Sequence, residues 1–252
     1  MIRTQFNPRN PNICILLTAT IDPKGVIFVE RNNPIIREND YIKALKRWIN
    51  MQEFSVVFCE NSGYNIDKIK NIINEDRKKN IEILQFNGQC FPKELGKGYG
   101  EAIIIDYAIK NSKLIKSSEY VIKVTGRYFI ENIKKIASIL SKDSDIYVMA
   151  DLNKNLSWAD SRIFAFRPSF VVDYLSKYQN ILNDSKGFYL EHALARAVCH
   201  AISHGYKWVP LPSKPIIIGY SGTSDTPYKV SKVRWLAGDV IHKFKNYLNK
   251  RY

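Results

Sequence analysis

Three glycines at alternate positions, Gly96, Gly98 and Gly100, stand directly before a stretch of helical periodicity, with Lys97 between the first two. Glycine lets a ligand approach the backbone closely, and a helix N-terminus beside a cation attracts anions such as phosphate. The spacing fits neither the GxxxxGK[ST] P-loop nor the dinucleotide fingerprint, which should follow the first strand. We therefore predict a ligand-binding loop formed by Lys97, Gly98, Gly100 and Glu101. The alternative is a plain turn at a helix start.

Two cations accompany an apolar stretch that is typical of a buried strand, Tyr120–Thr125. Lys123 lies within this stretch, and Arg127 follows its end. A buried cation needs an anionic partner, because an unpaired buried charge is costly. A diphosphate fits that need, and an arginine side chain binds it as a bidentate fork. The alternative is an internal salt bridge, for example with Glu101 or Asp151.

Glu191 is the strongest candidate for a catalytic carboxylate. It lies near the start of a strongly apolar helical stretch, 189–204, where the helix dipole favours a negative charge. A general base in that place removes a proton from an attacking hydroxyl within hydrogen-bonding reach. The alternative is stabilisation of the first helical turn. His192 is a second candidate for the base, or for a phosphate contact.

Aspartates flank the predicted strand Ile146–Ala150. Asp151 follows the strand, so we count it among the catalytic candidates, as a ligand for a metal ion or a sugar hydroxyl. Asp143-Ser144-Asp145 has the DxD pattern but precedes the strand, at the wrong end of a parallel sheet. We interpret it as a turn.

Short β-branched or aromatic runs alternate with longer amphipathic stretches along the chain. This pattern predicts a single-domain α/β fold with a mostly parallel central sheet flanked by helices. The predicted strands are Ile13–Thr20, Ser55–Glu60, Ile81–Phe86, Tyr120–Thr125, Ile146–Ala150 and Ser161–Phe166. The predicted helices are Asn39–Asn50, Asn65–Asn80, Gly100–Asn111, Ile130–Leu140, Ser169–Lys177, Tyr189–His204 and Lys229–Arg251. Asn39 and Asp40 are the predicted cap of the first helix.

Ligands of an open parallel sheet bind where its strands end, beside the loops that follow. The first predicted strand ends in Thr18, Ala19 and Thr20, which supply small hydroxyls and backbone groups for a base or a ribose. The second ends in Glu60 and Asn61, where a carboxylate and an amide emerge as the chain turns. Both strand ends are therefore candidates for ligand binding.

The chain has 252 residues, of which 45% are hydrophobic and 25% charged, an ordinary composition for a globular protein. Lys and Arg outnumber Asp and Glu by 38 to 24, and the net charge of +14 predicts attraction to nucleotides, nucleic acid or an anionic membrane face. The longest apolar run, 13–21, is too short to span a bilayer, and no signal peptide opens the sequence. The four cysteines form no CxxC pair, which favours a reducing cytoplasm over a disulfide scaffold or zinc ribbon.

The end of the chain differs from the rest, so we separate a segment, 221–252, from the main domain, 1–220. Nine basic residues and two acidic ones lie between Lys207 and Tyr252, which is half of the whole positive excess. A basic amphipathic helix with aromatic residues can lie on an anionic membrane surface. The alternative is a terminal helix packed on the domain with a solvated basic face. The apolar stripe of this helix comprises Val233, Leu236, Ala237, Val240, Ile241, Phe244 and Leu248.

Four short motifs, taken in order, resemble those of bacterial GT-A-type glycosyltransferases that build capsule or lipopolysaccharide. They are Phe58-Cys59-Glu60-Asn61-Ser62-Gly63-Tyr64, Gly96-Lys97-Gly98-Tyr99-Gly100-Glu101, Lys123-Val124-Thr125-Gly126-Arg127-Tyr128 and Glu191-His192. The resemblance covers most of residues 12–220 in the order of elements and is specific only at these motifs. It implies a GT-A-like (Rossmann-like) domain that transfers a sugar from a nucleotide sugar to a glycan or lipid-linked acceptor. It also implies a place in the cytoplasm or on the cytoplasmic face of the inner membrane.

The resemblance also implies roles for single residues. Thr18–Thr20 and Glu60–Asn61 would meet the nucleoside, and Lys97–Glu101 would line the donor site. Lys123 and Arg127 stand about where many relatives carry the metal-binding DxD, and Thr125, between them, is a further candidate for donor binding. This departure predicts that cations bind the diphosphate, so no metal ligand is predicted, with Mg²⁺ or Mn²⁺ as the open alternative. Glu191 falls where inverting members place their base.

Three other functions are alternatives to this one. A nucleic-acid-binding protein would gather basic and aromatic side chains on one face, but no RNA- or DNA-binding motif is present, and we expect no specific nucleic-acid partner. A nucleotidyltransferase that makes an activated sugar shares the strand order, yet the first loop lacks its glycine-arginine signature. The third alternative is a catalytically inactive, sugar-binding relative.

Overall fold

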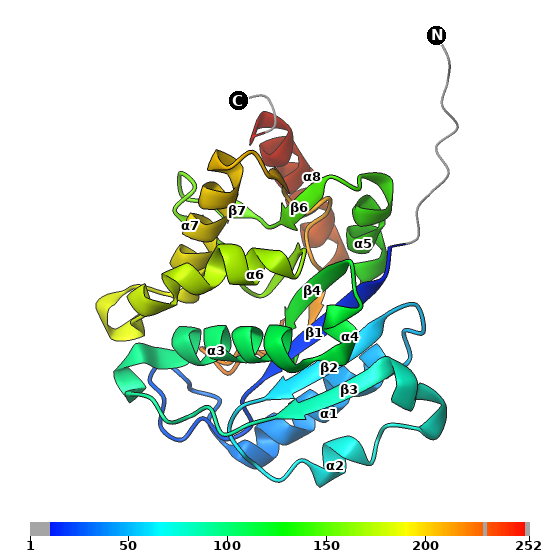
Figure 1. The fold of residues 1–252 in the computed structure, drawn as a ribbon, viewed down its shortest axis with the longest axis vertical. Coiled ribbons are helices and arrows are strands. Elements are labelled where there is room, and N and C mark those ends of the chain that lie inside the picture. The colour runs from blue at the N-terminus through cyan, green and yellow to red at the C-terminus, as the bar shows by residue number, and fades with distance from the viewer. Residues whose placement is uncertain (1–10, 229–230, 250–252) are drawn as a thin grey trace.

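A sheet of seven strands runs through the molecule, and helices cover both of its faces (Figure 1). The computed structural model describes residues 11–228 and 231–249. The strands of this sheet are β1 Ile13–Ala19, β2 Ser55–Glu60, β3 Ile81–Gln85, β4 Tyr120–Thr125, β6 Ile146–Met149, β9 Ile163–Phe166 and β10 Lys207–Val209. Their order is β10-β6-β9-β4-β1-β2-β3, in which β9 runs antiparallel to β4 and β6 and the other neighbours are parallel. The predicted α/β fold with a mostly parallel central sheet is confirmed.

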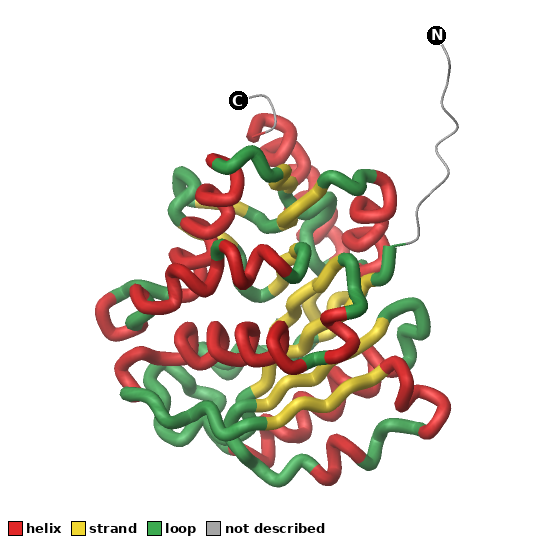
Figure 2. The backbone as a smooth tube through the Cα atoms, in the orientation of Figure 1, coloured by secondary structure: helices red, strands yellow, loops and turns green. Residues whose placement is uncertain are grey.

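The helices and two small sheets complete the described structure, and Figure 2 shows how helices and loops surround the strands. The helices are α1 Pro34–Ile49, α2 Asp67–Lys70, α3 Gly96–Asn111, α4 Lys113–Lys116, α5 Ile133–Lys142, α6 Ser169–Asp173, α7 Leu190–Ser203 and α8 Lys232–Asn249. Short 3₁₀ segments lie at Glu75–Asn80, Lys93–Leu95, Leu175–Ile181 and Asp184–Lys186. In the small antiparallel sheets, β5 Phe129–Ile130 pairs with β11 Ile217–Ile218, and β7 Leu152–Asn153 pairs with β8 Trp158–Ala159.

Alternate residues of β1 point to opposite faces of the sheet and so divide the core in two. Ile15 and Leu17 belong to a cluster with α1, α2 and α5. Cys14 and Leu16 belong to a second cluster with α3, α6 and α7. All four side chains are completely buried. Because helices cover both faces, β1 is apolar from Ile13 to Leu17 instead of alternating with polar residues.

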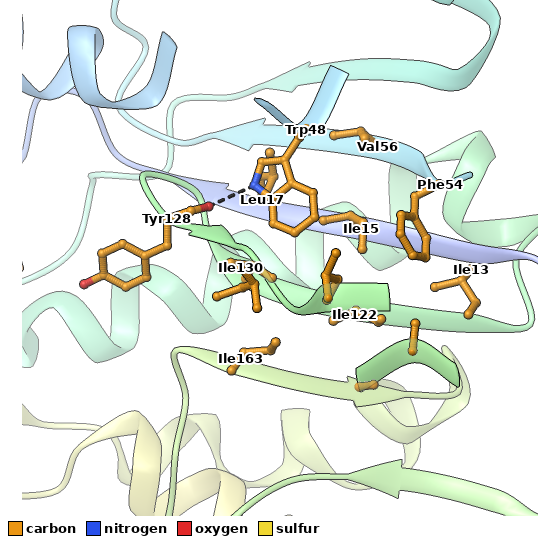
Figure 3. Close-up of a cluster of buried hydrophobic side chains, with 14 of the residues drawn as sticks. Ile13, Ile15, Leu17, Trp48, Phe54, Val56, Ile122, Tyr128, Ile130 and Ile163 are labelled. Carbon is orange, nitrogen blue, oxygen red and sulfur yellow. Dashed lines mark hydrogen bonds between the residues drawn. The ribbon is translucent and has the colours of Figure 1, made fainter. Parts of the chain in front are cut away.

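Trp48 of α1 connects the first of these clusters to the edge of the sheet. Figure 3 shows its indole beside Ile15 and Leu17, with Nε1 donating to the main-chain oxygen of Tyr128 at 2.8 Å. Tyr128 lies just after the end of β4. This hydrogen bond therefore fixes the turn that carries Arg127.

Helix α1 begins five residues earlier than predicted. The side chain of Asn33 accepts hydrogen bonds from two backbone N–H groups of the first turn, and Pro34 occupies the first helical position, where its fixed φ is suitable. The predicted cap at Asn39 and Asp40 is wrong, because both residues lie inside the helix. The additional turn brings Arg37 to the edge where the strands end.

The predicted helix Asn65–Asn80 is wrong in its length. Only α2 forms there, and Glu75–Asn80 is a 3₁₀ segment without a buried residue. Ile66 and Ile69 do pack into the core. The last seven residues of the predicted helix contain no apolar side chain, and helices in proteins gain most of their stability by burying an apolar face.

The remaining predicted elements are present, most of them with shifted ends. Strands β2 and β4 have the predicted bounds, whereas α6 ends four residues early and continues as a 3₁₀ segment. The last predicted helix is found as α8, and residues 229, 230, 250 and 251 of that prediction lie outside the described residues. Among the helices of residues 11–228 and 231–249, none has the length and apolar character that crossing a membrane requires.

Candidate active site

A cavity of about 210 Å³ lies at the edge of the sheet where the parallel strands β1 and β4 end. Its walls come from these strand ends, the first turns of α3 and α7, part of α1, and residues of the segment 219–228. Sites in open parallel sheets lie at this edge. The cavity brings together parts of three of the four sequence motifs. The predicted site residues that line it are Thr18, Thr20, Lys97, Gly98, Gly100, Glu101, Thr125, Arg127 and Glu191.

Glu101 of α3 is held between the ends of β1 and β4. Thr18 and Thr125 are neighbours in the parallel pairing of these strands, and Thr18 Oγ1 donates to Glu101 Oε1 at 2.6 Å. Lys123, two residues before Thr125 and so on the same face of β4, places Nζ 2.6 Å from the same oxygen. Burial alone would raise the pKa of Glu101, but the Lys123 ammonium and the Thr18 hydroxyl hold that pKa below its usual value. Glu101 is therefore an anion at neutral pH.

Lys123 also connects Glu101 to the candidate base. Its Nζ donates to the main-chain oxygen of Ser161 at 2.5 Å, and Ser161 Oγ donates to Glu191 Oε1 at 2.7 Å. Ser161 lies just before β9, and Glu191 lies in the first turn of α7. One chain of polar contacts thus runs from Glu101 through Lys123 and Ser161 to Glu191.

The predicted contact between Lys123 and a diphosphate is not available in this arrangement. Lys123 is completely buried and does not line the cavity. The alternative, an internal salt bridge, is confirmed, with Glu101 as the partner and not Asp151. Lys123 is a positioning residue, because its single ammonium orients both Glu101 and the backbone of Ser161.

The glycine-rich stretch 96–100 forms the first turn of α3 and is not a loop before it. The anion at this helix N-terminus is the carboxylate of Asp184, whose Oδ2 accepts from the Gly98 N–H at 3.3 Å. A Cβ on Gly96 would lie 2.2 Å from Asp184 Oδ2, and one on Gly98 would lie 2.9 Å from Asp184 Oδ1. Gly96 also has φ +80°, in the left-handed region that favours glycine. The glycines do permit a close approach, but the approaching group is a carboxylate of the protein itself.

Asp184 contributes a titratable group to the cavity wall. It is 2% exposed. Burial raises the pKa of this carboxyl to about 6, with a smaller contribution from the nearby charge of Glu191. The Gly98 N–H and the charge of Lys97 act in the opposite direction. Asp184 thus gains or loses its proton in mildly acidic solution.

Arg127 and Lys97 bring positive charge to the cavity. Arg127 Nε donates to the main-chain oxygen of Tyr220 at 3.1 Å, and Lys97 Nζ donates to Thr223 Oγ1. Both acceptors belong to the segment 219–228, most of which lies beyond the domain boundary predicted at residue 220. These hydrogen-bond partners are neutral, and the carboxylates of Glu101 and Asp184 act on Arg127 and Lys97 through their charges, so the positive charge of the two cations is partly balanced within the cavity.

Several residues of the site were not found from the sequence. Arg37 is 4% exposed and donates to the main-chain oxygen of Thr20 at 2.8 Å, which holds the chain just after β1. Asp184 lies in a short 3₁₀ segment, and Ser161 entered the prediction only as the start of a strand. The alternate glycines were the one available signal for Asp184, because the space beside them has to be filled by some group.

Ala19, Glu60 and Asn61 lie behind the cavity and do not line it. All three are essentially completely buried. Glu60 accepts from backbone N–H groups of the loops that follow β1 and β2. Asn61 Oδ1 accepts from Thr20 Oγ1 at 2.7 Å, and Asn61 Nδ2 donates to Gly100 O at 3.3 Å. Their side chains therefore position lining residues, and the predicted contact with a nucleoside is not open to them.

Asp151 and His192 also lie outside the cavity. Asp151 Oδ1 accepts from the Leu211 N–H at 3.0 Å, and Oδ2 lies 3.7 Å from Nδ1 of His242 on α8. Burial raises the pKa of Asp151 to about 6. His192 Nδ1 accepts from the Tyr189 N–H at 3.1 Å and so caps α7. Neither side chain is placed to touch a ligand in this cavity.

The three carboxylates that line the cavity, Glu101, Asp184 and Glu191, come from different elements, and each accepts a hydrogen bond from the chain itself. The Asp143–Asp145 turn precedes β6, as predicted, and Asp143 pairs with Lys207 at 2.7 Å. Within the part of the chain that the structure describes, no three His, Cys, Asp or Glu side chains are grouped to hold a metal ion.

No protein-family model matches the sequence, and no curated protein sequence matches it. Solved structures with a similar arrangement include a Desulfovibrio desulfuricans G20 protein described as a nucleotide-diphospho-sugar transferase, with 11% identity, a TM-score of 0.48 and 79% of each chain covered. A mannosyltransferase from Pyrobaculum calidifontis, in complex with GDP-Man and Mn²⁺, has 9% identity and a TM-score of 0.45 over 98% of this chain and 68% of its own. A cytidylyltransferase from Leptospira borgpetersenii has 14% identity and a TM-score of 0.42 over 88% and 82%. Similarity at this level concerns the arrangement of elements and not the activity.

Proposed function

We propose that the protein is a glycosyltransferase that moves a sugar from a nucleotide-activated donor to an acceptor hydroxyl. The observation that carries this proposal is one cavity whose lining includes the cations Arg127 and Lys97 together with the carboxylate of Glu191. A departing diphosphate needs positive charge, and an attacking hydroxyl needs a base. The resemblance of residues 96–101 and 123–128 to GT-A-type motifs supports the same assignment.

Arg127 is the residue that we assign to the departing diphosphate. Its Nε donates to the Tyr220 carbonyl, and the guanidinium also interacts with the Tyr128 side chain, so two neutral partners orient a group that can donate to phosphate oxygens. Lys97 would join it from the first turn of α3 by exchanging Thr223 for a phosphate oxygen. Negative charge grows on the diphosphate as the sugar–oxygen bond breaks, so cations that are already in place lower the barrier.

Glu191 is the proposed base. Ser161 holds Oε1, and we assign Oε2 to the acceptor hydroxyl. The proton moves to this carboxylate while the hydroxyl oxygen forms a bond to the anomeric carbon. The bond from that carbon to the diphosphate breaks on the opposite face, and its electron pair leaves with the diphosphate. The configuration at the anomeric carbon is then inverted. No step of this scheme uses a metal ion.

We further propose that the donor sugar is a hexose and that the acceptor is a glycan or lipid-linked saccharide in surface polysaccharide synthesis on the cytoplasmic side of the membrane. The resemblance of the four sequence motifs to enzymes of capsule and lipopolysaccharide synthesis supports this. Residues 1–220 would supply most of the catalytic domain. Ser221, Thr223 and Tyr228 would complete its cavity, and α8 would be an attached helix.

Thermal-shift measurements with UDP, GDP, CMP and dTDP sugars test the donor. We expect one class of donor to raise Tm, equally well with EDTA and with Mn²⁺, because Arg127 and Lys97 supply the charge. If no donor raises Tm, the proposed function is wrong. If only Mn²⁺ allows binding and EDTA abolishes it, the metal-free assignment of the diphosphate is wrong.

Glu191→Gln tests the base. We expect a loss of about 10²–10⁴-fold in kcat with donor affinity unchanged, because the amide cannot accept the proton. His192→Gln is the matched control, since the neighbouring side chain lies outside the cavity, and it should keep the wild-type rate. Near-normal transfer by Glu191→Gln would rule out this base.

The products and the polymer affinity distinguish the alternative functions. A glycosyltransferase releases a nucleoside diphosphate or monophosphate, whereas a nucleotidyltransferase releases pyrophosphate from a nucleoside triphosphate. Pyrophosphate release would replace the proposal with a nucleotidyltransferase. Tight, salt-sensitive retardation of RNA or DNA without any effect of nucleotide sugars would identify a nucleic-acid-binding protein.

A further inference from the structure

Helix α8 is attached to the domain by its polar side. Trp235 Nε1 donates to the Lys214 carbonyl at 3.1 Å, and Asp239 Oδ1 accepts from the Lys214 N–H at 2.8 Å. One turn further on, His242 Nε2 lies 2.9 Å from the Leu211 carbonyl oxygen. These partners belong to the stretch 211–214. Polar contacts therefore hold α8 in place, where an ordinary surface helix would bury an apolar face.

The opposite side of α8 carries large apolar side chains in solvent. Within residues 11–228 and 231–249 nothing covers them, and each is 57% to 77% exposed. Their spacing places them along one face of the helix, which we call the α8 stripe. A contiguous apolar stripe left outside marks an interaction site, whereas single exposed apolar residues do not. The α8 stripe consists of Val233, Leu236, Val240, Ile241 and Phe244.

Positive charge borders the α8 stripe. Residues 231–249 contain four basic residues and one acidic residue. Arg234 and Lys243 are exposed on α8, where Lys243 Nζ lies 2.7 Å from Asp239, and the exposed Lys135 of α5 lies on the Asp239 side of the helix, with Nζ 3.8 Å from that carboxylate. Asp239 is the acidic residue, and it points inward with its side chain 5% exposed. The outer face of α8 is therefore both apolar and positive.

We propose that α8 binds the surface of a lipid bilayer that contains anionic lipids. Apolar side chains of a surface helix insert at the boundary between headgroups and acyl chains, and flanking lysines and arginines meet the anionic headgroups. The α8 stripe and its basic border match both requirements. The net charge of +14 attracts the whole protein to such a surface.

Other occupants match only one of these two properties. A second copy of the chain would cover the stripe, but a two-fold pairing of α8 would bring Arg234 and Lys243 of both copies together. Nucleic acid would match the charge, but it would leave the five apolar side chains against phosphate and water. A bilayer surface accommodates both the stripe and the charge.

Docking through α8 would also place the cavity near a membrane. α8 begins at Lys232, four residues after Tyr228, which lines the cavity. An acceptor carried on a lipid would then be presented close to the site. The membrane proposal goes beyond the proposed function and does not depend on it.

Co-sedimentation with vesicles tests the proposal. The full-length protein is mixed with phosphatidylcholine vesicles and with phosphatidylcholine vesicles that contain phosphatidylglycerol, each at low and high salt. We expect binding to the anionic vesicles, at least about ten-fold weaker binding to phosphatidylcholine alone, and weaker binding at high salt. Failure to bind the anionic vesicles at low salt overturns the proposal.

Variants locate the binding surface. Leu236→Asp with Phe244→Asp disrupts the stripe and spares the polar contacts, and we expect at least about ten-fold weaker binding to anionic vesicles. Val172→Asp is the matched control, because Val172 is 56% exposed on α6, and it should bind as the wild type does. Arg234→Glu tests the charge without touching the stripe and should also weaken binding.

Circular dichroism melting establishes that each variant is folded, so a loss of binding reports on the surface. Unchanged vesicle binding by the folded double variant overturns the proposal. The proposal is also overturned if the wild type is a dimer that does not bind vesicles and the double variant is a monomer. The stripe would then be the contact surface for a second copy of the chain. These results do not involve nucleotide sugars, so they are independent of the test of the proposed function.

Discussion

Helices α3 and α8 have similar lengths, 16 and 18 residues, yet they present opposite sides to the domain. α3 packs apolar side chains such as Ile105 against the sheet and holds the charged Glu101 at the cavity. α8 turns Asp239 inward and leaves apolar side chains such as Ile241 in solvent. Apolar side chains thus face the core beside an internal site in one helix and form a free surface in the other.

The two helices differ in whether the side chains that are costly in their surroundings, buried charges in α3 and exposed apolar groups in α8, have contact partners in the chain. Around α3, the charges that leave water meet partners from other elements: Glu101 meets Lys123, and the helix N-terminus meets Asp184. Such groups are oriented before any ligand arrives. The α8 stripe has no partner in the described structure. Substitutions at the α3 contacts should therefore be costly, and substitutions on the stripe should be nearly neutral in solution.

The largest expected effect is that of Lys123→Met, which leaves Glu101 without its cation in a mostly buried place. We expect the free energy of unfolding to fall by about 3–4 kcal/mol, measured by urea denaturation. The double variant Lys123→Met with Glu101→Gln is the control, and it should recover part of the loss because no unpaired charge remains. Wild-type stability of the single variant would show that this ion pair does not hold the site together.

For Asp184 we expect a smaller effect on the free energy of unfolding, and this effect depends on pH. Its pKa is raised from the ordinary 3.8 to about 6, so the folded protein keeps a proton that the unfolded chain releases. The stability from this group is fully present below about pH 4 and is lost as the pH rises to about 6. We expect the difference in unfolding free energy between wild type and Asp184→Asn to fall by about 2 kcal/mol across that window.

The pKa of Asp151 is also raised, but Asp151 titrates in both the wild type and Asp184→Asn. Its contribution to stability therefore cancels in the difference between the two proteins. Asp239→Asn is the matched control. Hydrogen bonds from Lys243, Lys214 and Ser213 outweigh burial and lower the pKa of Asp239 to about 2. Its contribution is present above about pH 4 and is lost only at lower pH, so this control should show a constant difference over the same window. A constant difference for Asp184→Asn as well would contradict the prediction.

The smallest effect is expected on the α8 stripe. Ile241→Ser should change the free energy of unfolding by less than about 0.5 kcal/mol in the absence of lipid, because the side chain is already in solvent. The same exchange at the completely buried Ile105 of α3 is the control and should cost several-fold more. Equal costs at the two positions, measured by urea denaturation, would remove the contrast between the helices.

The sequence predicts the elements that depend on local patterns. β2 and β4 have the predicted bounds because both are short runs rich in β-branched and aromatic residues that end sharply, at Asn61 and at Gly126. The helix predicted over 65–80 is wrong because its charged second half has nothing to bury. The apolar stripe near the C-terminus was also predicted, but its direction was not. Helical spacing defines a face, and the packing of the whole chain decides which way that face points.

The candidate site was predictable only where its residues lie at or just after the end of a strand, or begin a helix. Thr18, Arg127 and Glu191 meet that condition, and all three line the cavity. Lys123 was assigned to a ligand because nothing in the sequence ranks Glu101 above a diphosphate as its partner. Asp184 gave no local signal at all, since its role arises from a contact with a helix that lies more than eighty residues away in the chain.

Strand β9 is the reversed member of the main sheet, and its direction has a consequence for redesign. The chain leaves the sheet at the cavity edge after β1 and β4, and it enters the sheet from that edge through Ser161 and Arg162, which lead into β9. These two residues contact the end of β4 by main-chain oxygens, since Ser161 O accepts from Lys123 Nζ and Arg162 O accepts from the Thr125 N–H. A library of side chains at residues 160–162 would therefore retune the surroundings of Glu191 while these main-chain contacts to β4 remain available.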